Sequence, residues 1–507
     1  MKLQHSFFTL LLFALGGMLL FQACGDDEEP VFPAPAISVV GDNLVNLKPG
    51  QDITVELSLQ AEGGLSSIIV NRGGGFLEEI TLPDPDATTF TYTGQTVPAD
   101  AMEGEAIEYE FIGVNTQDLE SAPAAFSVSV NLYDAIDIGG TSVFDVDLPA
   151  DGIIPAGTTV KFAEGRSYYL AQPAPDVNVS FEEGSTFQVE AGVTIYLQAG
   201  VDMDVTVFGT ADIRGTADAP VVMTSENVLR PGVEPEAGDW NDFQIEGQGK
   251  GTNSGFVQYL RIEYAGDRAF ILDDVGNGTQ VSHVQVWQCT DEAIFIAGGD
   301  VNVSHLIATN SEDTQYRTDD NYTGNMQFII AVSTVPGDGD ESMYLRGDSE
   351  ALISNVTIVD PGAEFEPDGE PDGIRFWSSR GNKMYNAVVT GIPSWATRAE
   401  ANETDGRPEV TDINGPVVFA YSNVFGCDQL ARDDAEAFFT DPSFNNSEEA
   451  IPGIGANDFV PDARAGSDFD PSTLGSFFAP ANFKGAIESP DNDWTLGWVK
   501  NPDGSVR

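Results

Sequence analysis

The sequence predicts an all-β protein with an N-terminal immunoglobulin-like sandwich, a parallel β-helix and a C-terminal cap. Two observations support this prediction. Short segments of alternating apolar and polar residues fill the first part of the chain, and a strand motif recurs in the second part, with steps such as 24, 22 and 31 residues between copies. The 53 glycines and 29 prolines supply the frequent turns that both architectures need.

The predicted sandwich covers residues 36–132. Its strands are expected at 37–40, 53–59, 90–92, 107–111 and 126–130, where apolar residues alternate with polar ones. This part of the chain has no cysteine pair and no tryptophan, so it would be a bacterial variant of the immunoglobulin-like fold. We expect it to act as a spacer rather than as a ligand-binding domain, because the fold alone implies no function.

The predicted β-helix covers residues 136–437. Five segments share one strand motif: Val257–Ile262, Val281–Val286, Val303–Ala308, Ile353–Ile358 and, more weakly, Met384–Val389. Each repeat has too few apolar residues to form a core alone, so successive coils must stack about 4.8 Å apart. The third position of the motif is then expected to form an interior ladder of ring or polar side chains: Tyr259, His283, His305, Asn355 and Asn386.

Residues 438–507 are rich in Asp, Pro and Gly and contain few strand patterns. Aromatic residues cluster at Phe477, Phe478, Phe483, Trp494 and Trp498. We expect this segment to fold back over the last coil, because an uncovered solenoid end exposes a strand edge that invites pairing with other chains.

The N-terminus predicts export. Residues 1–23 read as a secretory signal that ends in an apolar run, and Ala23-Cys24 resembles a bacterial lipoprotein processing site. Cys24 would carry the lipid, and residues 24–35 would be an acidic linker to the membrane anchor. Within it, Asp26, Asp27, Glu28 and Glu29 resemble the surface-export signal of Bacteroidota lipoproteins. The alternative is an ordinary signal peptide that is cut near Ala23.

The formal net charge is −59, from 22 basic and 81 acidic side chains. Such a charge repels nucleic acid and anionic lipid headgroups, and it suits solubility, high salt or divalent cations. Disorder is excluded because 41% of the residues are hydrophobic and they alternate in short runs. Besides Cys24, the chain has Cys289 and Cys427, which are either a disulfide or two buried thiols.

The candidate binding residues are acidic. Glu312, Asp313, Asp319 and Asp320 surround Arg317, and Asp291 and Glu292 follow the preceding repeat at a comparable position. These carboxylates suit a Ca²⁺ site, a sugar-binding site or a catalytic acid pair, but a solvated acidic loop is the simpler interpretation in so acidic a chain. His283 and His305 belong to one ladder and lack the further ligands that a zinc site needs.

Several longer motifs occur in a fixed order: GDWNDFQIEG from Gly238, QYLRIEYAG from Gln258, TDDNYTGNMQF from Thr318, FFAPANFKGAI from Phe477 and NDWTLGW from Asn492. Over residues 140 to 507 the chain therefore resembles a family of Bacteroidota surface lipoproteins with a pectate-lyase-like, right-handed parallel β-helix. The resemblance implies the fold and an outer-membrane, outward-facing location, but no established activity. Arg317 stands where the family pattern has an acidic residue, which weakens the case for a shared acidic site.

Two functions remain open. The first is a non-catalytic surface module that binds a glycan or a protein partner. The second is a calcium-dependent polysaccharide lyase or glycosidase, which clustered aromatic and basic residues would favour. Trp240 and Trp377 are candidates for stacking on sugar rings, although a core or capping role is the simpler expectation for both. The strongly negative charge disfavours an acidic polysaccharide as the ligand.

Overall fold

The computed structural model describes residues 31–334, 341–361, 371–379, 381–400, 410–455 and 458–507. The predicted signal peptide, the predicted lipidation site Cys24 and the predicted export signal Asp26 to Glu29 lie outside these residues. The chain divides into two compact units, the first built from residues up to 45 together with 52–96 and 106–128, and the second from the remainder. No helix in the described part of the chain is long and apolar enough to cross a membrane.

The N-terminal unit is a sandwich of two sheets. One sheet has the order β1-β3-β6 and the other β2-β8-β7-β4-β5. Alternation determines which side chains face inward, as in β3, where Ile53 and Val55 are buried and Thr54 between them is exposed. Aromatic rings pack between the two sheets, since the ring centroids of Tyr92 on β6 and Phe111 on β7 lie 5.2 Å apart. The strands are β1 Ala36–Val39, β2 Leu44–Leu47, β3 Asp52–Gln60, β4 Leu65–Arg72, β5 Gly75–Thr81, β6 Thr89–Thr96, β7 Ala106–Asn115 and β8 Ala124–Val130.

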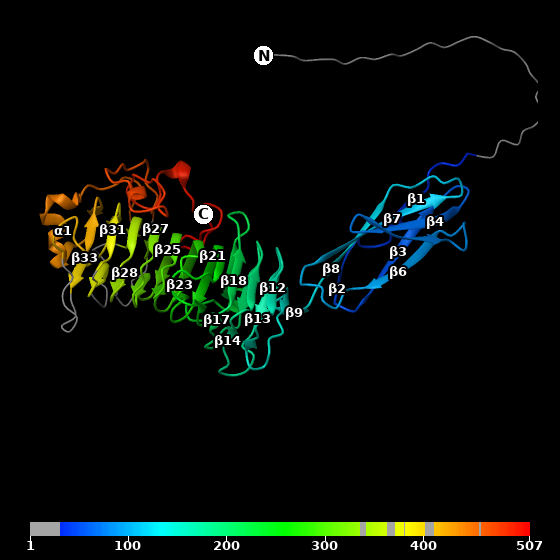
Figure 1. The fold of residues 1–507 in the computed structure, drawn as a ribbon, viewed down its shortest axis with the longest axis horizontal. Helices are drawn as coiled ribbons and strands as arrows, with labels where there is room; N and C mark the ends of the chain where they lie inside the picture. Colours follow the sequence, from blue (N-terminus) through cyan, green and yellow to red (C-terminus); the bar gives the residue numbers. More distant parts are fainter. Residues whose placement is uncertain (1–30, 335–340, 362–370, 380, 401–409, 456–457) are drawn as a thin grey trace, which may run out of the picture. The chain divides into compact units, whose positions relative to one another are not determined.

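The second unit is a parallel β-helix (Figure 1). One of its walls is an eleven-stranded sheet to which each coil adds one short strand, and neighbours in the sheet pair in parallel. The predicted fold class is therefore confirmed. In order, the strands of this wall are β11 Ile153–Ile154, β14 Val179–Phe181, β17 Val205–Val207, β20 Phe243–Glu246, β22 Phe270–Asp273, β24 Ile294–Ala297, β26 Tyr316–Asp319, β28 Glu341–Arg346, β30 Asp372–Trp377, β33 Trp395–Glu400 and β36 Gln429–Asp433.

The remaining strands of each coil form the opposite side, here called the long wall. Its central strands carry the repeated motif and are β21 Gly255–Ala265, β23 Gln280–Cys289, β25 Asn302–Ser311, β27 Asn325–Val332 and β29 Leu352–Val359. Earlier coils contribute β9 Asp134–Ile138, β10 Thr141–Asp145, β12 Thr159–Phe162, β13 Ser167–Leu170, β15 Thr186–Val189, β16 Thr194–Leu197, β18 Thr210–Arg214 and β19 Val221–Ser225. Later coils contribute β31 Lys383–Tyr385, β32 Val388–Thr390, β34 Val418–Ala420 and β35 Asn423–Phe425.

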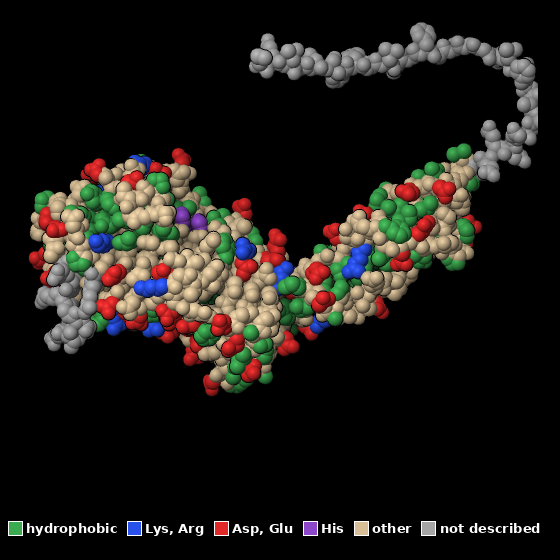
Figure 2. Space-filling model, viewed as in Figure 1, with side chains coloured by type: hydrophobic (Ala, Val, Ile, Leu, Met, Phe, Trp, Pro, Cys, Tyr) green, Lys and Arg blue, Asp and Glu red, His purple; other side chains and the backbone are tan. Residues whose placement is uncertain are grey.

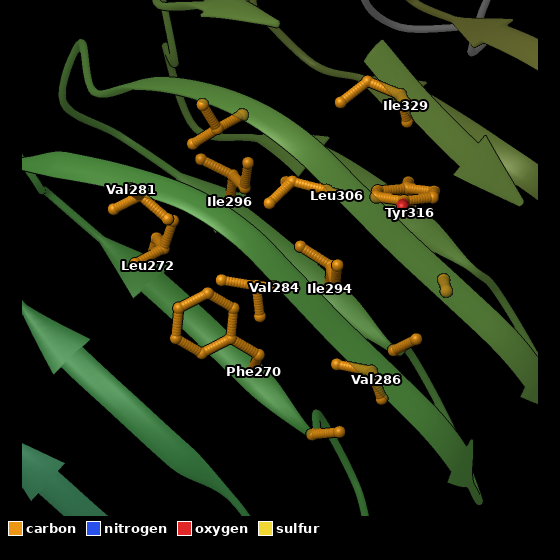
Figure 3. Packing of buried hydrophobic residues seen from close by; sticks show 14 of the residues in the cluster. Phe270, Leu272, Val281, Val284, Val286, Ile294, Ile296, Leu306, Tyr316 and Ile329 are labelled. Atoms are coloured by element: carbon orange, nitrogen blue, oxygen red, sulfur yellow. The ribbon is translucent and has the colours of Figure 1, made fainter. Parts of the chain in front are cut away.

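The core of the β-helix consists of aliphatic and aromatic stacks between the two walls (Figure 3). Val284 pairs with Leu306, and Leu306 pairs with Ile329, on three successive coils of the long wall. Ile294 and Tyr316 are register partners on the eleven-stranded sheet. All five side chains are at most 1% exposed, so the coil-to-coil register is maintained by burial of the same apolar position in every repeat.

Only the first part of the C-terminal region covers the last coil. Phe438, in helix α1 (Ala437–Thr440), lies 5.8 Å from Phe419 on β34 and 5.7 Å from Phe376 on β30. The following residues instead return along the outer surface of the long wall, so that the C-terminus lies beside β21 in Figure 1. The reason is a row of outward apolar side chains on that wall, which the C-terminal segment buries: Ile307, Ile330, Val332, Val359 and Val388.

Candidate functional site

The predicted ladder residues occupy the bend of each long-wall strand. Tyr259, His283 and His305 all have φ between 50° and 57°, in the left-handed region. Strand pairing skips them, since Gln258 pairs with Ser282 and Leu260 with Val284. The Tyr259 and His283 rings stack with centroids 4.3 Å apart, and His283 and His305 stack at the same distance with ring planes within 6°. The two histidines therefore lie on adjacent coils.

This ladder faces outward, not into the core as we expected. The bend places its side chains under the C-terminal segment, and the neighbouring apolar residues fill the interior. His305 packs edge-on to Trp494 at 4.8 Å. Asn355 donates to the carbonyls of Ala481 and Phe483, and Asn386 donates to the carbonyl of Ala481 and to a further carbonyl of the segment.

Burial lowers the pKa of His283 to about 4 and that of His305 to about 3, which keeps both rings neutral near pH 7. The residues of the ladder thus bind the chain's own C-terminal segment, which is a structural role. Phe328, on the coil between His305 and Asn355, belongs to the same series, with φ 61° and its ring 4.7 Å from His305. The sequence motif did not identify Phe328, because this position was expected to carry a polar side chain or a ring with a polar atom.

The predicted acidic residues do not form one site. Glu292 and Asp319 are buried and pair with arginines, whereas Glu312 and Asp320 are exposed. The hydroxyl of Thr314 donates to Asp313 at 3.4 Å. Among the described residues, one group of three carboxylates has ligand atoms within 4.8 Å of one another, and it consists of Asp267, Asp291 and Glu292. Two members of that group were predicted, but Glu292 already receives hydrogen bonds from Arg268 and Arg317.

A second set of side chains lies on the outer surface of the eleven-stranded sheet. Because alternate residues of a strand point to opposite faces, the residues between the core positions of β24 to β36 point outward. Register aligns them from coil to coil in the order Phe295, Arg317, Tyr344, Arg375, Arg398 and Arg432. Arg346 and Trp377 follow Tyr344 and Arg375 by two residues on the same strands, and they are also register partners. We call these eight residues the arginine face.

Arginine and aromatic side chains alternate along this face from Phe295 to Arg375, and two further arginines follow. The guanidinium of Arg317 lies 5.2 Å from the Phe295 ring centroid and 5.8 Å from that of Tyr344. Arg346 lies 4.5 Å from the Trp377 ring centroid, and Arg375 lies 5.2 Å from that of Tyr344. Such contacts fix the planes of the guanidinium groups while leaving N–H groups at their edges for hydrogen bonds.

Carboxylates neutralise this face. Asp319 pairs with Arg317 at 2.9 Å and with Arg346 at 3.6 Å. Glu400 pairs with Arg375 and Arg398. Across β22 to β36 and the residues that flank them, six arginines therefore meet six carboxylates: Arg268, Arg317, Arg346, Arg375, Arg398 and Arg432 with Glu292, Asp319, Glu341, Asp372, Glu400 and Asp433. In Figure 2, basic and acidic side chains are interspersed along the lower edge of the β-helix.

Asp372 is the most perturbed carboxyl group of this surface. It is 1% exposed and lies opposite Glu341 in the strand register. Its pKa is raised to about 7, mainly by burial and also by the charge of Glu341, whereas Arg398 at 3.3 Å opposes the shift. One of its oxygens, Oδ1, has no hydrogen-bond partner among the described residues.

The two tryptophans singled out in the sequence differ. Trp240 is fully buried and donates from its indole N–H to the carbonyl of Glu263 at 2.9 Å, so it is a core residue. Trp377 is half-buried on the arginine face, and the guanidinium of Arg346 lies 4.5 Å from its ring centroid. Cys289 and Cys427 are free thiols, and burial raises the pKa of each to about 12.

Sequence reasoning missed the arginine face as a unit. The available signal was the recurrence of arginine in the short strands of this wall, as in Tyr316-Arg317-Thr318-Asp319, Ile374-Arg375-Phe376-Trp377 and Thr397-Arg398-Ala399-Glu400. In a chain with only 22 basic residues, five arginines on one face are a strong concentration.

Residues 244–424 match a family described as a pectate-lyase-like β-helix domain. Several solved structures are similar. Fibronectin(III)-like modules of CbhA from Clostridium thermocellum show 15% identity and a TM-score of 0.15 over 20% of this chain and 47% of that chain, about half its length. A periplasmic alginate epimerase shows 10% identity and a TM-score of 0.28 over 59% of this chain and 77% of that one.

A pectate lyase from Erwinia chrysanthemi, solved with tetragalacturonic acid, shows 10% identity and a TM-score of 0.16 over 78% of this chain and 98% of that one. No curated protein matches the chain. The family match places a pectate-lyase-like β-helix domain at the part of the chain that carries most of the arginine face.

Proposed function

We propose that this pectate-lyase-like β-helix protein is a non-catalytic module that binds an uncharged polysaccharide along the arginine face. The observation that carries the proposal is the row of aromatic rings and ion-paired arginines repeated on successive coils. Because the coils repeat every ~4.8 Å, such a row offers similar contacts to several units of an extended chain.

The chemistry of the face fits sugar hydroxyl groups. Arg346 and Arg375 provide N–H donors, Asp319 and Glu400 provide acceptors, and the half-buried Trp377 provides a flat apolar surface. Since carboxylates already pair with these arginines, a uronate would have to displace them inside a molecule with net charge −59. An uncharged glycan avoids this cost, which is why we favour it over an acidic one.

The test is a panel of soluble polysaccharides, both uncharged (glucans, mannans, xylans, galactans) and acidic (pectate, alginate), measured by affinity electrophoresis and calorimetry. Trp377→Ala should weaken binding about 10-fold, as expected for the loss of ~1.4 kcal/mol of ring contact. Phe256→Ala is the matched control, because Phe256 also lies under an arginine, Arg214 at 4.6 Å, but on the long wall. Binding only to acidic glycans, or equal losses in both variants, would refute the proposal.

We also propose that the protein is a lipoprotein anchored through Cys24 to the outer membrane and facing the cell exterior, with the sandwich as a spacer. The support is the sequence pattern at residues 1–29. Metabolic labelling with a fatty acid should mark the native protein but not a Cys24→Ser variant. Protease treatment of intact cells should degrade it, and survival of the protein would contradict surface exposure.

A glycosidase is the second candidate function. It is favoured by the raised pKa of Asp372 beside the ionisable Glu341, because glycosidases use one protonated and one ionised carboxyl group. New reducing ends in the panel, lost in Asp372→Asn, would replace the binding role by this one. Unsaturated uronate absorbance that depends on added Ca²⁺ would instead indicate a lyase.

A further inference from the structure

A small pocket lies between the last coils of the long wall and the C-terminal segment. Its volume is about 340 Å³, which is in the size range of small-molecule sites. Asn423 on β35 forms one side, and the other sides come from the C-terminal segment: Ser447, residues 449–452, residues 462–466 and Lys484. None of the eight residues of the arginine face lines this pocket, so it is a separate site.

Lys484 contributes a positive charge that is not neutralised by an ion pair. Its ammonium group donates to Oδ1 of the buried Asn423 at 2.5 Å, which is its one hydrogen bond within the described part of the chain. Two of its three N–H groups therefore remain for a ligand. Burial lowers the pKa of Lys484, and nearby carboxylates oppose this shift. Arg464, the other cation of the pocket, is instead paired with Glu488 at 2.8 Å. An anionic group that enters the pocket would supply the counter-charge that Lys484 lacks.

The other side chains of the pocket restrict the ligand further. The hydroxyl of Ser447 accepts the N–H of Glu449 at 3.1 Å, which leaves its own hydrogen available to a ligand. The side chains of Glu449 and Asp462 are exposed to solvent and bring two negative charges to the same pocket. The remaining side chains of the lining are mostly apolar: Ala450, Ile451, Pro452, Ala463 and Ala465.

We propose that this pocket binds a small zwitterion of the amino-acid class with an apolar side chain. The carboxylate of the ligand accepts from Lys484 and Ser447, and its ammonium group faces Glu449 and Asp462. A simple anion would meet these two carboxylates and the charge of −59 of the whole chain, whereas a simple cation would meet Lys484. A zwitterion pairs with both signs of charge and adds no net charge. This site does not depend on the proposed glycan binding.

The experiment is calorimetry and saturation-transfer NMR with three ligands of the same apolar body. They are leucine, isocaproate, which lacks the amino group of leucine, and isopentylamine, which lacks its carboxylate. We expect leucine to bind and the other two to bind about 10-fold more weakly or not at all, because each leaves one sign of charge in the pocket unpaired. No binding of leucine, valine or alanine at millimolar concentration would overturn the proposal, as would isocaproate binding as tightly as leucine.

Two variants test the residues of the pocket. Lys484→Met keeps the apolar stem of the side chain and should weaken leucine binding about 10-fold or more. Glu449→Gln changes an exposed side chain, so it is expected to fold, and it should weaken binding about 3-fold. Lys383→Met is the matched control, because Lys383 is a half-buried lysine of β31 that does not line the pocket. Trp377→Ala should also leave leucine binding unchanged, which separates this site from the glycan proposal. Equal leucine binding by the unaltered protein, Lys484→Met and Glu449→Gln would overturn the proposal.

Discussion

At the residue scale, Asp360 shows how burial makes stability depend on pH. It is buried at the end of β29 and accepts a hydrogen bond from the Ser342 hydroxyl at 3.0 Å. Burial raises its pKa from 3.8 to about 7. The folded state therefore keeps the proton up to about pH 7, whereas the unfolded chain loses it near pH 4. Stability is greatest below that lower value and falls as the pH rises through this window.

We predict that Asp360→Asn removes this dependence. Its contribution between pH 4 and 7 is on the order of 4 kcal/mol, and the amide can still accept the Ser342 hydrogen bond. Urea unfolding at several pH values should show a shallower decline for Asp360→Asn than for the unaltered protein. Identical slopes for the two proteins would contradict the assignment.

At the element scale, the long wall needs its C-terminal cover. Trp498 is fully buried in the cluster that includes Ile307 and Ile330, and its carbonyl accepts a hydrogen bond from Arg261 at 2.6 Å. We predict that Trp498→Ala costs about 3–5 kcal/mol, as for other buried aromatic residues. Thermal unfolding should show a lower midpoint and increased binding of a hydrophobic dye. Trp377→Ala, on the half-buried arginine face, should change the midpoint much less.

The elements also show what sequence patterns reveal. The repeated motif predicted β21, β23, β25 and β29, because each carries the same alternation around a ring or amide. It missed β27, where Phe328 stands at the ladder position. The path of the C-terminal segment was not predictable, because outward apolar residues such as Ile307 and Val388 form a row only after the coils stack.

The candidate site was harder to predict for the same reason. Phe295, Arg317 and Tyr344 are separated by more than twenty residues each, and coils of unequal length separate them in the chain. Only the strand register aligns them, and no single repeat contains the alternation of rings and arginines. By contrast, the acidic positions were visible as local clusters, but most of their charge is used in ion pairs or exposed to solvent.

At the scale of the whole molecule, charge is distributed unevenly. The chain carries −59 in total, yet the arginine face has balanced charges. Self-repulsion among the remaining carboxylates should destabilise the folded state at low ionic strength. We predict a higher unfolding temperature in 0.5 M than in 0.02 M NaCl, because the Debye length falls from roughly 20 Å to about 4 Å. A midpoint that does not change with salt would contradict this expectation.

This charge distribution also predicts that uncharged and acidic polysaccharides differ in how their binding depends on salt. An uncharged polysaccharide bound by Trp377 and the paired arginines forms no ion pair with the protein. Its affinity should therefore change less than about 2-fold over that salt range. An acidic polysaccharide would meet the repulsion of the whole molecule at low salt and would bind better as salt screens that repulsion. Calorimetry at the two salt concentrations distinguishes these outcomes. A steep loss of affinity with salt would instead show that the arginines are released from Glu400 and Asp319 to pair with an anionic ligand, and the neutral-glycan proposal would then fail.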